Sequence, residues 1–300
     1  MCFHAANGAL PQGSDTASLP EPWPKSGDTF PNCERISGRR WNGWDMTPED
    51  GSTVKTAVTS FEILEGIREL DGAGPTELAR HLDRSKSGVY KHVRTLADEG
   101  YLIETEGSYQ LGLGLWTLGA GGRSAYPVEA GRRPVDSLVA SVGEPTNLVM
   151  YDDGTAASVY CELPTGTVES QCRLGDALPL HATAAGKAIL AHLPDDERQS
   201  TLDSLALEQH TPETITDVGS LTAELESVRQ QRTAIEIEEY REGGHGVASP
   251  VLDDTGRPIG AVYVTGAAGD LSERRLEAKI SGLVVSASRS VENALSTASD

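Results

Sequence analysis

The chain has 300 residues, with 25 Lys or Arg and 45 Asp or Glu, which gives a formal net charge of −20. This length predicts about two domains of roughly 100–200 residues each. Its apolar runs fall far short of the roughly 20 residues that span a bilayer, and the N-terminus carries no signal-peptide pattern. We therefore expect a cytoplasmic protein that does not enter the membrane.

The charge bears on which partners are expected, because an acidic surface normally repels nucleic acids. Only six of the basic residues are Lys, and aromatic residues make up 5% of the chain. Acidic surfaces of this kind are common in proteins from salt-saturated cytoplasm, where at 1 M salt screening acts within about 3 Å. We therefore expect a halophilic protein. The charge is also uneven, since residues 53–113 have a net charge of −3 and residues 114–300 have a net charge of −14.

Residues 1–52 differ in composition from the rest of the chain. They contain interspersed Pro, Gly and Ser and show neither helical nor strand periodicity. This composition predicts a disordered tail. The alternative is that translation begins at Met46, since a short polar stretch separates that residue from the first helical pattern.

Residues 53–113 predict a winged helix-turn-helix DNA-binding domain. Three helical segments come first, and Pro75 suits the first turn of the second one. Ser85 is the expected N-cap of the third helix, which ends at Gly100. Two short strands then flank Glu106-Gly107. The expected inward residues of the helices are Val58, Phe61, Leu64, Ile67, Leu70, Leu78, Ala79, Leu82, Val89, Val93 and Leu96.

The third helix is the expected recognition helix, whose first turns enter the major groove of double-stranded DNA. Its outward face is polar and locally basic, and we expect Lys86, Ser87 and Tyr90 to contact base edges. Lys91 and Arg94 are expected at phosphates. The other expected DNA contacts are Ser85 and, at the wing, Ser108. The alternative is an ordinary solvated face.

Residues 114–143 are mostly apolar and small and end in a helical pattern, which indicates a linker helix. Residues 144–300 then alternate strand-like runs with helical patterns. The strand-like runs are "TNLVMYDD", "TAASVYCEL", "TVESQCRLG" and a hairpin around Asp254-Thr255-Gly256. A final helix from Ser272 is expected to bury Leu276, Ile280, Leu283, Ala287 and Val291. The pattern predicts an α+β chain whose second domain has a mainly antiparallel sheet.

Two blocks of this second domain resemble the IclR family of transcriptional regulators. They are "LPLHATAAGKAILAHLP" at 178–194 and "EEYREGGHGVASPVLDDTGRPIGAVYVTG" at 238–266. The resemblance covers about residues 53–298. It implies a winged helix that dimerises on DNA and a GAF-like effector-binding domain that pairs dimers into tetramers, so a homodimer or a homotetramer is expected. It also implies a small-molecule effector, commonly a small organic acid, an aromatic acid or a sugar-derived compound.

The same resemblance implies the effector site. It places Glu236 where the family is usually acidic, Gly246 where it often has Cys, and Tyr263 and Thr265 where it often has Ser. Tyr263 and Thr265 are two residues apart on one strand, so both face the same side. Gln171 and Cys172, on a neighbouring expected strand, are further candidates. The alternative for each residue is ordinary strand packing.

Other functions find less support in the residues. Gly186-Lys187 lacks the Gly five residues earlier and the Ser or Thr that follow in a phosphate loop, so Lys187 and His181 are expected to be structural. The four cysteines form no CxxC pair, which predicts reduced thiols and no metal site. We expect no cofactor and no catalytic residue. An enzyme or a protein-binding scaffold built on the second domain remains the alternative function.

Overall fold

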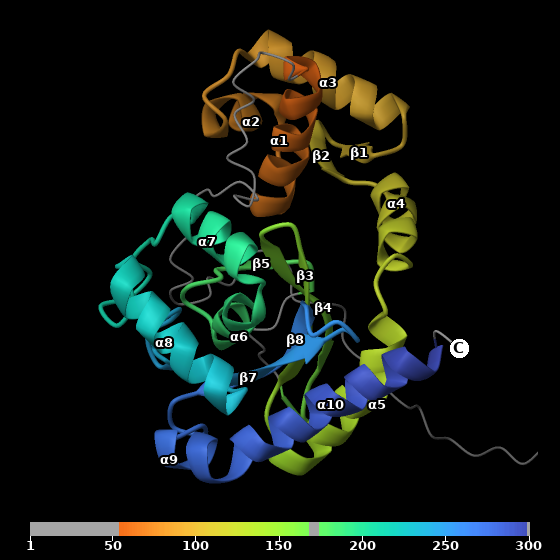
Figure 1. Cartoon of the computed structure of the whole chain (residues 1–300). Helices are drawn as coiled ribbons and strands as arrows, with labels where there is room; N and C mark the ends of the chain where they lie inside the picture. Colours follow the sequence, from red (N-terminus) through yellow and green to blue (C-terminus); the bar gives the residue numbers. More distant parts are fainter. Residues whose placement is uncertain (1–53, 168–173, 299–300) are drawn as a thin grey trace, which may run out of the picture. The chain divides into compact units, whose positions relative to one another are not determined.

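The computed structural model describes residues 54–167 and 174–298 (Figure 1). The expected tail at 1–52 and the candidates Gln171 and Cys172 lie outside the described residues. Cys161 is disulfide-bonded, so the expectation of reduced thiols is wrong for this residue. That expectation rested on the spacing of the cysteines along the chain, and this spacing does not show which cysteines lie close together in the folded protein.

The first domain is a winged helix-turn-helix, as predicted (Figure 1). Pro75 begins the second helix, and the Ser85 hydroxyl caps the third by accepting from the Gly88 N–H. Glu106 and Gly107 have φ values of 53° and 82° and form a two-residue hairpin turn. The elements are α1 (Lys55–Glu69), α2 (Pro75–His81), α3 (Lys86–Asp98), β1 (Leu102–Thr105) and β2 (Ser108–Leu111).

The core of this domain confirms most of the expected inward residues but not Phe61. The Phe61 side chain is 66% exposed, whereas Ile63 and Ile67 are fully or almost fully buried. Since a helix turns about 100° per residue, Phe61 lies roughly opposite Ile63. The buried side of α1 is therefore the side that carries Ile63 and Ile67, and Phe61 lies on the opposite, exposed side.

The second domain is built on a six-stranded sheet in the order β5-β4-β3-β8-β7-β6, and every neighbouring pair is antiparallel. The α+β architecture is therefore confirmed. Strand β6 was not expected, because it has only four residues and begins soon after a helical pattern ends. Most of the expected strand at "TVESQCRLG" lies outside the described residues. The strands are β3 (Thr146–Asp152), β4 (Thr155–Glu162), β5 (Ala177–Leu178), β6 (Ala234–Ile237), β7 (Gly244–Leu252) and β8 (Pro258–Ala267).

Helices cover both faces of this sheet (Figure 1). One face packs against α6 and α8 through a core that includes Ala188, Leu225 and Tyr263. The opposite face packs against α5 and α10 through residues such as Leu148 and Val264. The helices of this domain are α5 (Val128–Val142), α6 (Ala184–His192), α7 (Asp195–Ser204), α8 (Val218–Gln231), α9 (Glu273–Arg275) and α10 (Ser281–Ala298).

Two helical segments differ in detail from their expected form. The linker expected at 114–143 contains two helices, α4 (Leu113–Arg123) and α5, and α5 packs into the second domain through Val135 and Leu138. The final helix is interrupted by a π-helical turn, η1 (Leu276–Ile280), between α9 and α10. Leu283, which was expected to be buried there, is only partly buried.

Candidate functional site

The outward face of α3 is the first candidate site. Ser85, Lys86, Ser87, Lys91 and Arg94 are all exposed. Tyr90 is 47% exposed, which is high for an aromatic side chain. The opposite side of the helix holds Val89 and Val93 in the core of the domain. The two faces predicted from helical spacing are therefore present in the structure.

Three basic side chains, Lys86, Lys91 and Arg94, lie on this face. A hydrogen bond to Tyr90, one turn earlier, and then the charges of Tyr90 and Asp98 raise the pKa of Arg94 above its usual value. Ser108 lies on the wing as the first residue of β2 and is partly buried. The turn before it carries the acidic Glu106, which is unfavourable beside a phosphate.

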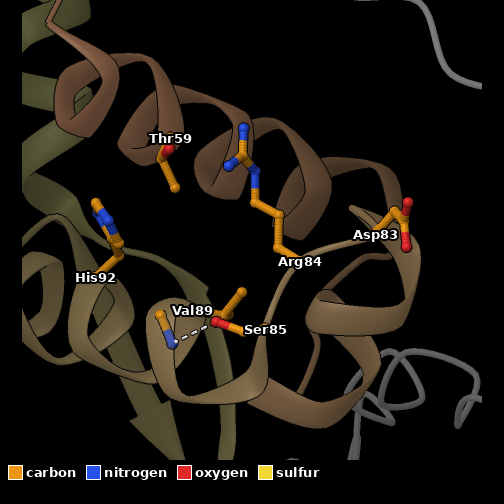
Figure 2. A pocket seen from close by; sticks show the side chains of 7 residues that line it. Thr59, Asp83, Arg84, Ser85, Val89 and His92 are labelled. Carbon is orange, nitrogen blue, oxygen red and sulfur yellow. Dashed lines mark hydrogen bonds between the residues drawn. The ribbon is translucent and has the colours of Figure 1, made fainter.

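A polar cleft beside the start of α3 was not predicted. It has a volume of about 370 Å³, and Figure 2 shows Thr59 of α1 and His92 of α3 on its walls. Arg84, at its edge, makes an ion pair with Glu62 of α1. This pairing ties the loop before α3 to α1 and so supports the start of the helix. The sequence carried no signal for the cleft, because its walls come from separate helices.

The second candidate site lies on the face of the sheet that α6 covers. Glu236 of β6, Gly246 of β7 and Thr265 of β8 are directly paired in register and form a row across three strands. Tyr263 is two residues before Thr265 and belongs to the core on this face. The structure therefore brings these four predicted residues together.

Hydrogen bonds connect this row to the start of α6. The Tyr263 hydroxyl donates to Oε2 of Glu236 at 2.9 Å, and the same oxygen accepts from the Ala184 N–H at 3.1 Å. Thr183 caps α6, since its Oγ1 accepts from the Gly186 N–H at 3.1 Å. The sequence motif "HATAAGKA" thus forms a capped helix whose first amide faces a buried carboxyl group.

Burial changes the acidity of both partners. Desolvation raises the pKa of Glu236 to about 7, against the lowering effect of its bonds with Ala184 and Tyr263. Desolvation and the charge of Glu236 raise the pKa of Tyr263 well above its usual value. Glu236 is 3% exposed, so little water reaches it. The pair is a phenol donor and a carboxyl acceptor that titrates near neutral pH.

A small cavity of about 40 Å³ adjoins this pair. Three predicted residues line it, namely Glu236, Tyr263 and Thr265. Sequence reasoning missed the remaining lining residues, among them Asn147 of β3 and Ser158 of β4, which are polar side chains in mostly apolar strands and are buried in the structure. The Ser158 hydroxyl donates to Oδ1 of Asn147 at 2.9 Å. The other lining residues are Asp176, Leu178, Tyr240, Arg241 and Gly244.

Lys187 and His181 are buried side chains that contact neighbouring segments of the second domain. Lys187 is 1% exposed, and its Nζ lies 2.6 Å from Oε1 of Glu239. His181 is 2% exposed, its Nε2 lies 2.9 Å from the Glu208 carbonyl oxygen, and its ring stacks on that of His210. These contacts hold α6 and the segment before it to neighbouring loops.

Across residues 54–167 and 174–298, no group of three or more His, Cys, Asp or Glu side chains is arranged to hold a metal ion. None of the helices there is long and apolar enough to cross a membrane.

Comparison with known proteins gives matches over both domains. The family model for the bacterial transcriptional regulator IclR C-terminal domain matches residues 128–293, and the model for the IclR helix-turn-helix domain matches residues 57–105. The probable transcriptional regulator SauR of Cupriavidus necator is 33% identical over 69% of this chain and 84% of its own length. The probable HTH-type transcriptional regulator ArcR of Halobacterium salinarum is 28% identical over 82% of this chain and 95% of its own. The crystal structure of the Thermotoga maritima IclR superimposes with a TM-score of 0.65 at 25% identity, over 80% of this chain and 98% of that one.

Proposed function

The chain belongs to the IclR family of transcriptional regulators, and we propose that it reads its operator with the outward face of α3 and senses its effector at the cavity beside Glu236. The family consists of DNA-binding regulators with a C-terminal ligand-binding domain, so the chain is a DNA-binding transcriptional regulator controlled by a small molecule.

The observation that carries the DNA-binding proposal is the exposed stripe on α3. Lys86, Tyr90 and Arg94 are four residues apart and follow one side of the helix, and Ser87 and Lys91 lie beside them. Residues near the helix N-terminus reach base edges when such a helix enters the major groove. We therefore assign Lys86, Ser87 and Tyr90 to bases, and we assign Lys91 and Arg94 to phosphates together with Ser85 and the wing residue Ser108.

The test is operator binding by fluorescence anisotropy in 2 M KCl, using DNA from upstream of the gene and a scrambled fragment. The triple variant Lys86→Ala/Lys91→Ala/Arg94→Ala is expected to lose saturable binding to the upstream fragment. A charge-matched control changes three exposed basic residues of the second domain, and it is expected to bind like the native protein. The control substitutions are Arg274→Ala, Lys279→Ala and Arg289→Ala.

Equal operator binding by the triple variant and the control would contradict the assignment of these residues. No saturable binding of the upstream fragment by the native protein would favour the protein-binding scaffold or an operator located elsewhere. Turnover of a small molecule would favour the enzyme. We propose that the chain acts by binding alone, since the relatives named above are regulators.

We propose a homodimer as the unit that binds DNA, because paired half-sites match a twofold-symmetric protein. The support is α4, where no residue is buried within the chain. Leu113 and Trp116 are 78% and 77% exposed, and Leu118 is 59% exposed. Apolar side chains this exposed on one helix favour a second copy as their partner.

Light scattering after size-exclusion chromatography tests this assembly. The native protein is expected at the mass of a dimer or tetramer, and Leu113→Ser/Trp116→Ser is expected at a lower mass. Leu174→Ser, at another exposed leucine, is the matched control and should leave the mass unchanged. A native monomer would contradict the proposal.

High salt is the expected working condition of this protein. The release of counterions from DNA contributes less binding free energy as salt rises. A halophilic DNA-binding protein must therefore depend on shape, direct hydrogen bonds and apolar contacts, and a modestly basic helix is then sufficient. Operator binding that disappears between about 1 and 3 M KCl would contradict this proposal.

A further inference from the structure

The environment of Tyr263 has a feature that simple strand packing does not require. A Cβ atom placed on Gly246 would lie 2.5 Å from Cε2 and 3.0 Å from the hydroxyl oxygen of Tyr263. The phenol ring therefore occupies the space above Gly246 where a side chain of β7 would otherwise lie. The absence of a side chain at position 246 is what leaves room for the Tyr263 ring.

The polar end of the same ring is also matched by the protein. The Tyr263 hydroxyl donates to Glu236, whose Oε2 also accepts from the first amide of α6, that of Ala184. A buried carboxyl group beneath a helix N-terminus can bind a hydroxyl group strongly, because few waters compete there. In this chain the hydroxyl group comes from the protein.

The remaining space is small. The cavity next to the ring has a volume of about 40 Å³. Pockets that enclose small organic ligands usually have roughly 300–1,000 Å³. The space beside Asn147, Ser158 and Thr265 therefore holds a few waters while the Tyr263 ring is in place.

We propose that Tyr263 is a specificity-determining residue that fills the deep subsite of the effector pocket with its own phenol. The native chain then excludes small phenols from Glu236, and the space that remains beside Asn147, Ser158 and Thr265 admits only a small polar group of the effector, of the size of a few waters. This inference rests on the proposed effector-binding role of the domain. It assigns phenols as the ligand class that fits this deep subsite, which the Tyr263 ring fills in the native chain.

Chemical rescue tests the inference. Tyr263→Ala removes the ring and leaves the Glu236 acceptor, and phenol has the shape and the hydroxyl group of the deleted side chain. Engineered cavities of roughly 150 Å³ bind benzene in the same way. Thermal melting of the full chain in 2 M KCl, with and without phenol, gives the readout. Phenol at about five times its Kd is expected to raise the melting temperature of Tyr263→Ala by about 2–4 °C and to leave the native protein unchanged.

Two controls use the same geometry. Gly246→Met/Tyr263→Ala refills the space from the β7 side and is expected to lose the response to phenol. Benzene, which cannot donate to Glu236, is expected to stabilise Tyr263→Ala less than phenol does. Saturation-transfer NMR on phenol reports binding independently of the melting curve.

Several outcomes would overturn the inference. They are binding of phenol by the native protein, no binding by folded Tyr263→Ala, and binding by Tyr263→Phe, which keeps the ring in the subsite. If Tyr263→Ala does not fold, Tyr263→Ser replaces it in the phenol-rescue experiment. Tyr263→Phe still tests whether the ring at position 263 excludes phenol from the subsite. Operator binding without phenol is measured on the same samples, and its absence in the native protein would count against the proposed function and not against the occupied subsite.

Discussion

The Nζ atom of Lys187 lies 2.6 Å from Oε1 of Glu239 inside the second domain, and only 1% of the Lys187 side chain is exposed. Glu224 of α8 lies 3.4 Å from the same Nζ and is 37% exposed. The lysine of α6 thus joins α8 to the loop after β6. A buried charge is costly unless it is paired. The net free energy of this ion pair is therefore small, but the loss of one partner would leave the other as an unpaired buried charge and destabilise the fold.

Lys187→Met is expected to lower the free energy of unfolding by about 3 kcal/mol, because it leaves Glu239 buried without its cation. Urea unfolding followed by circular dichroism in 2 M KCl measures the change. Lys279→Met, at an exposed lysine, is the matched control and should have little effect. Adding Glu239→Gln to Lys187→Met should restore much of the loss, and a double variant less stable than Lys187→Met would contradict the assignment.

The acidity of Glu236 predicts how stability depends on pH. Its pKa is about 7 in the folded protein and is expected near 4.5 in the unfolded chain. Between these values the folded state binds more protons, so the Glu236 contribution to stability is complete below about pH 4.5 and is lost as pH rises to about 7. The expected loss is on the order of 3 kcal/mol.

The comparison of native protein with Glu236→Gln isolates this effect, since Glu239 and Lys187 also face the site and remain in both. Unfolding free energies are measured from pH 4.5 to pH 8 in constant KCl. The difference between the two proteins should change over this range, with the native protein losing stability relative to the variant as pH rises. Parallel curves would show that Glu236 does not titrate in this way.

The close approach of Gly246 to Tyr263 predicts strong coupling between the two positions. Gly246→Ala is expected to cost about 1–3 kcal/mol, because its Cβ would overlap the ring. In a Tyr263→Ala background the same change should cost much less, which gives a coupling energy of roughly 1–3 kcal/mol. A double-mutant cycle by urea unfolding measures it, and additive effects would show that the ring does not occupy this space in solution.

A substitution at Glu106 in the wing turn is expected to raise operator affinity. Glu106 has a φ of 53°, a conformation that Asn adopts more readily than Glu, and its charge opposes DNA phosphates. Glu106→Asn is expected to stabilise the first domain by on the order of 0.5 kcal/mol. It should also raise operator affinity a few-fold in the anisotropy assay. Glu106→Gln removes the same charge without the backbone benefit, so it should raise affinity and leave stability nearly unchanged. Unchanged operator affinity in both variants would show that the wing does not approach DNA, and weaker binding would show that the Glu106 charge does not oppose it.

Local patterns predicted much of the first domain correctly. The inward and outward faces of α3, the Ser85 cap and the two-residue turn at Glu106 all depend on neighbouring residues in the chain. The same local rule failed at Phe61, because several helical faces of α1 are apolar enough to pack. Which face is buried depended on the positions of α2 and α3, which the α1 sequence does not contain.

The sequence by itself determined the two domain types, the α3 stripe and the shared face of Tyr263 and Thr265, because the geometry of helix and strand repeats over a few residues. Only the tertiary structure decided that Glu236, Gly246 and Thr265 form one row, since strand register depends on pairing between distant segments. It also decided that the Tyr263 ring lies over Gly246 and bonds to Glu236. The depth and contents of a pocket follow from how sheet and helix pack, and no local pattern in the chain specifies that packing.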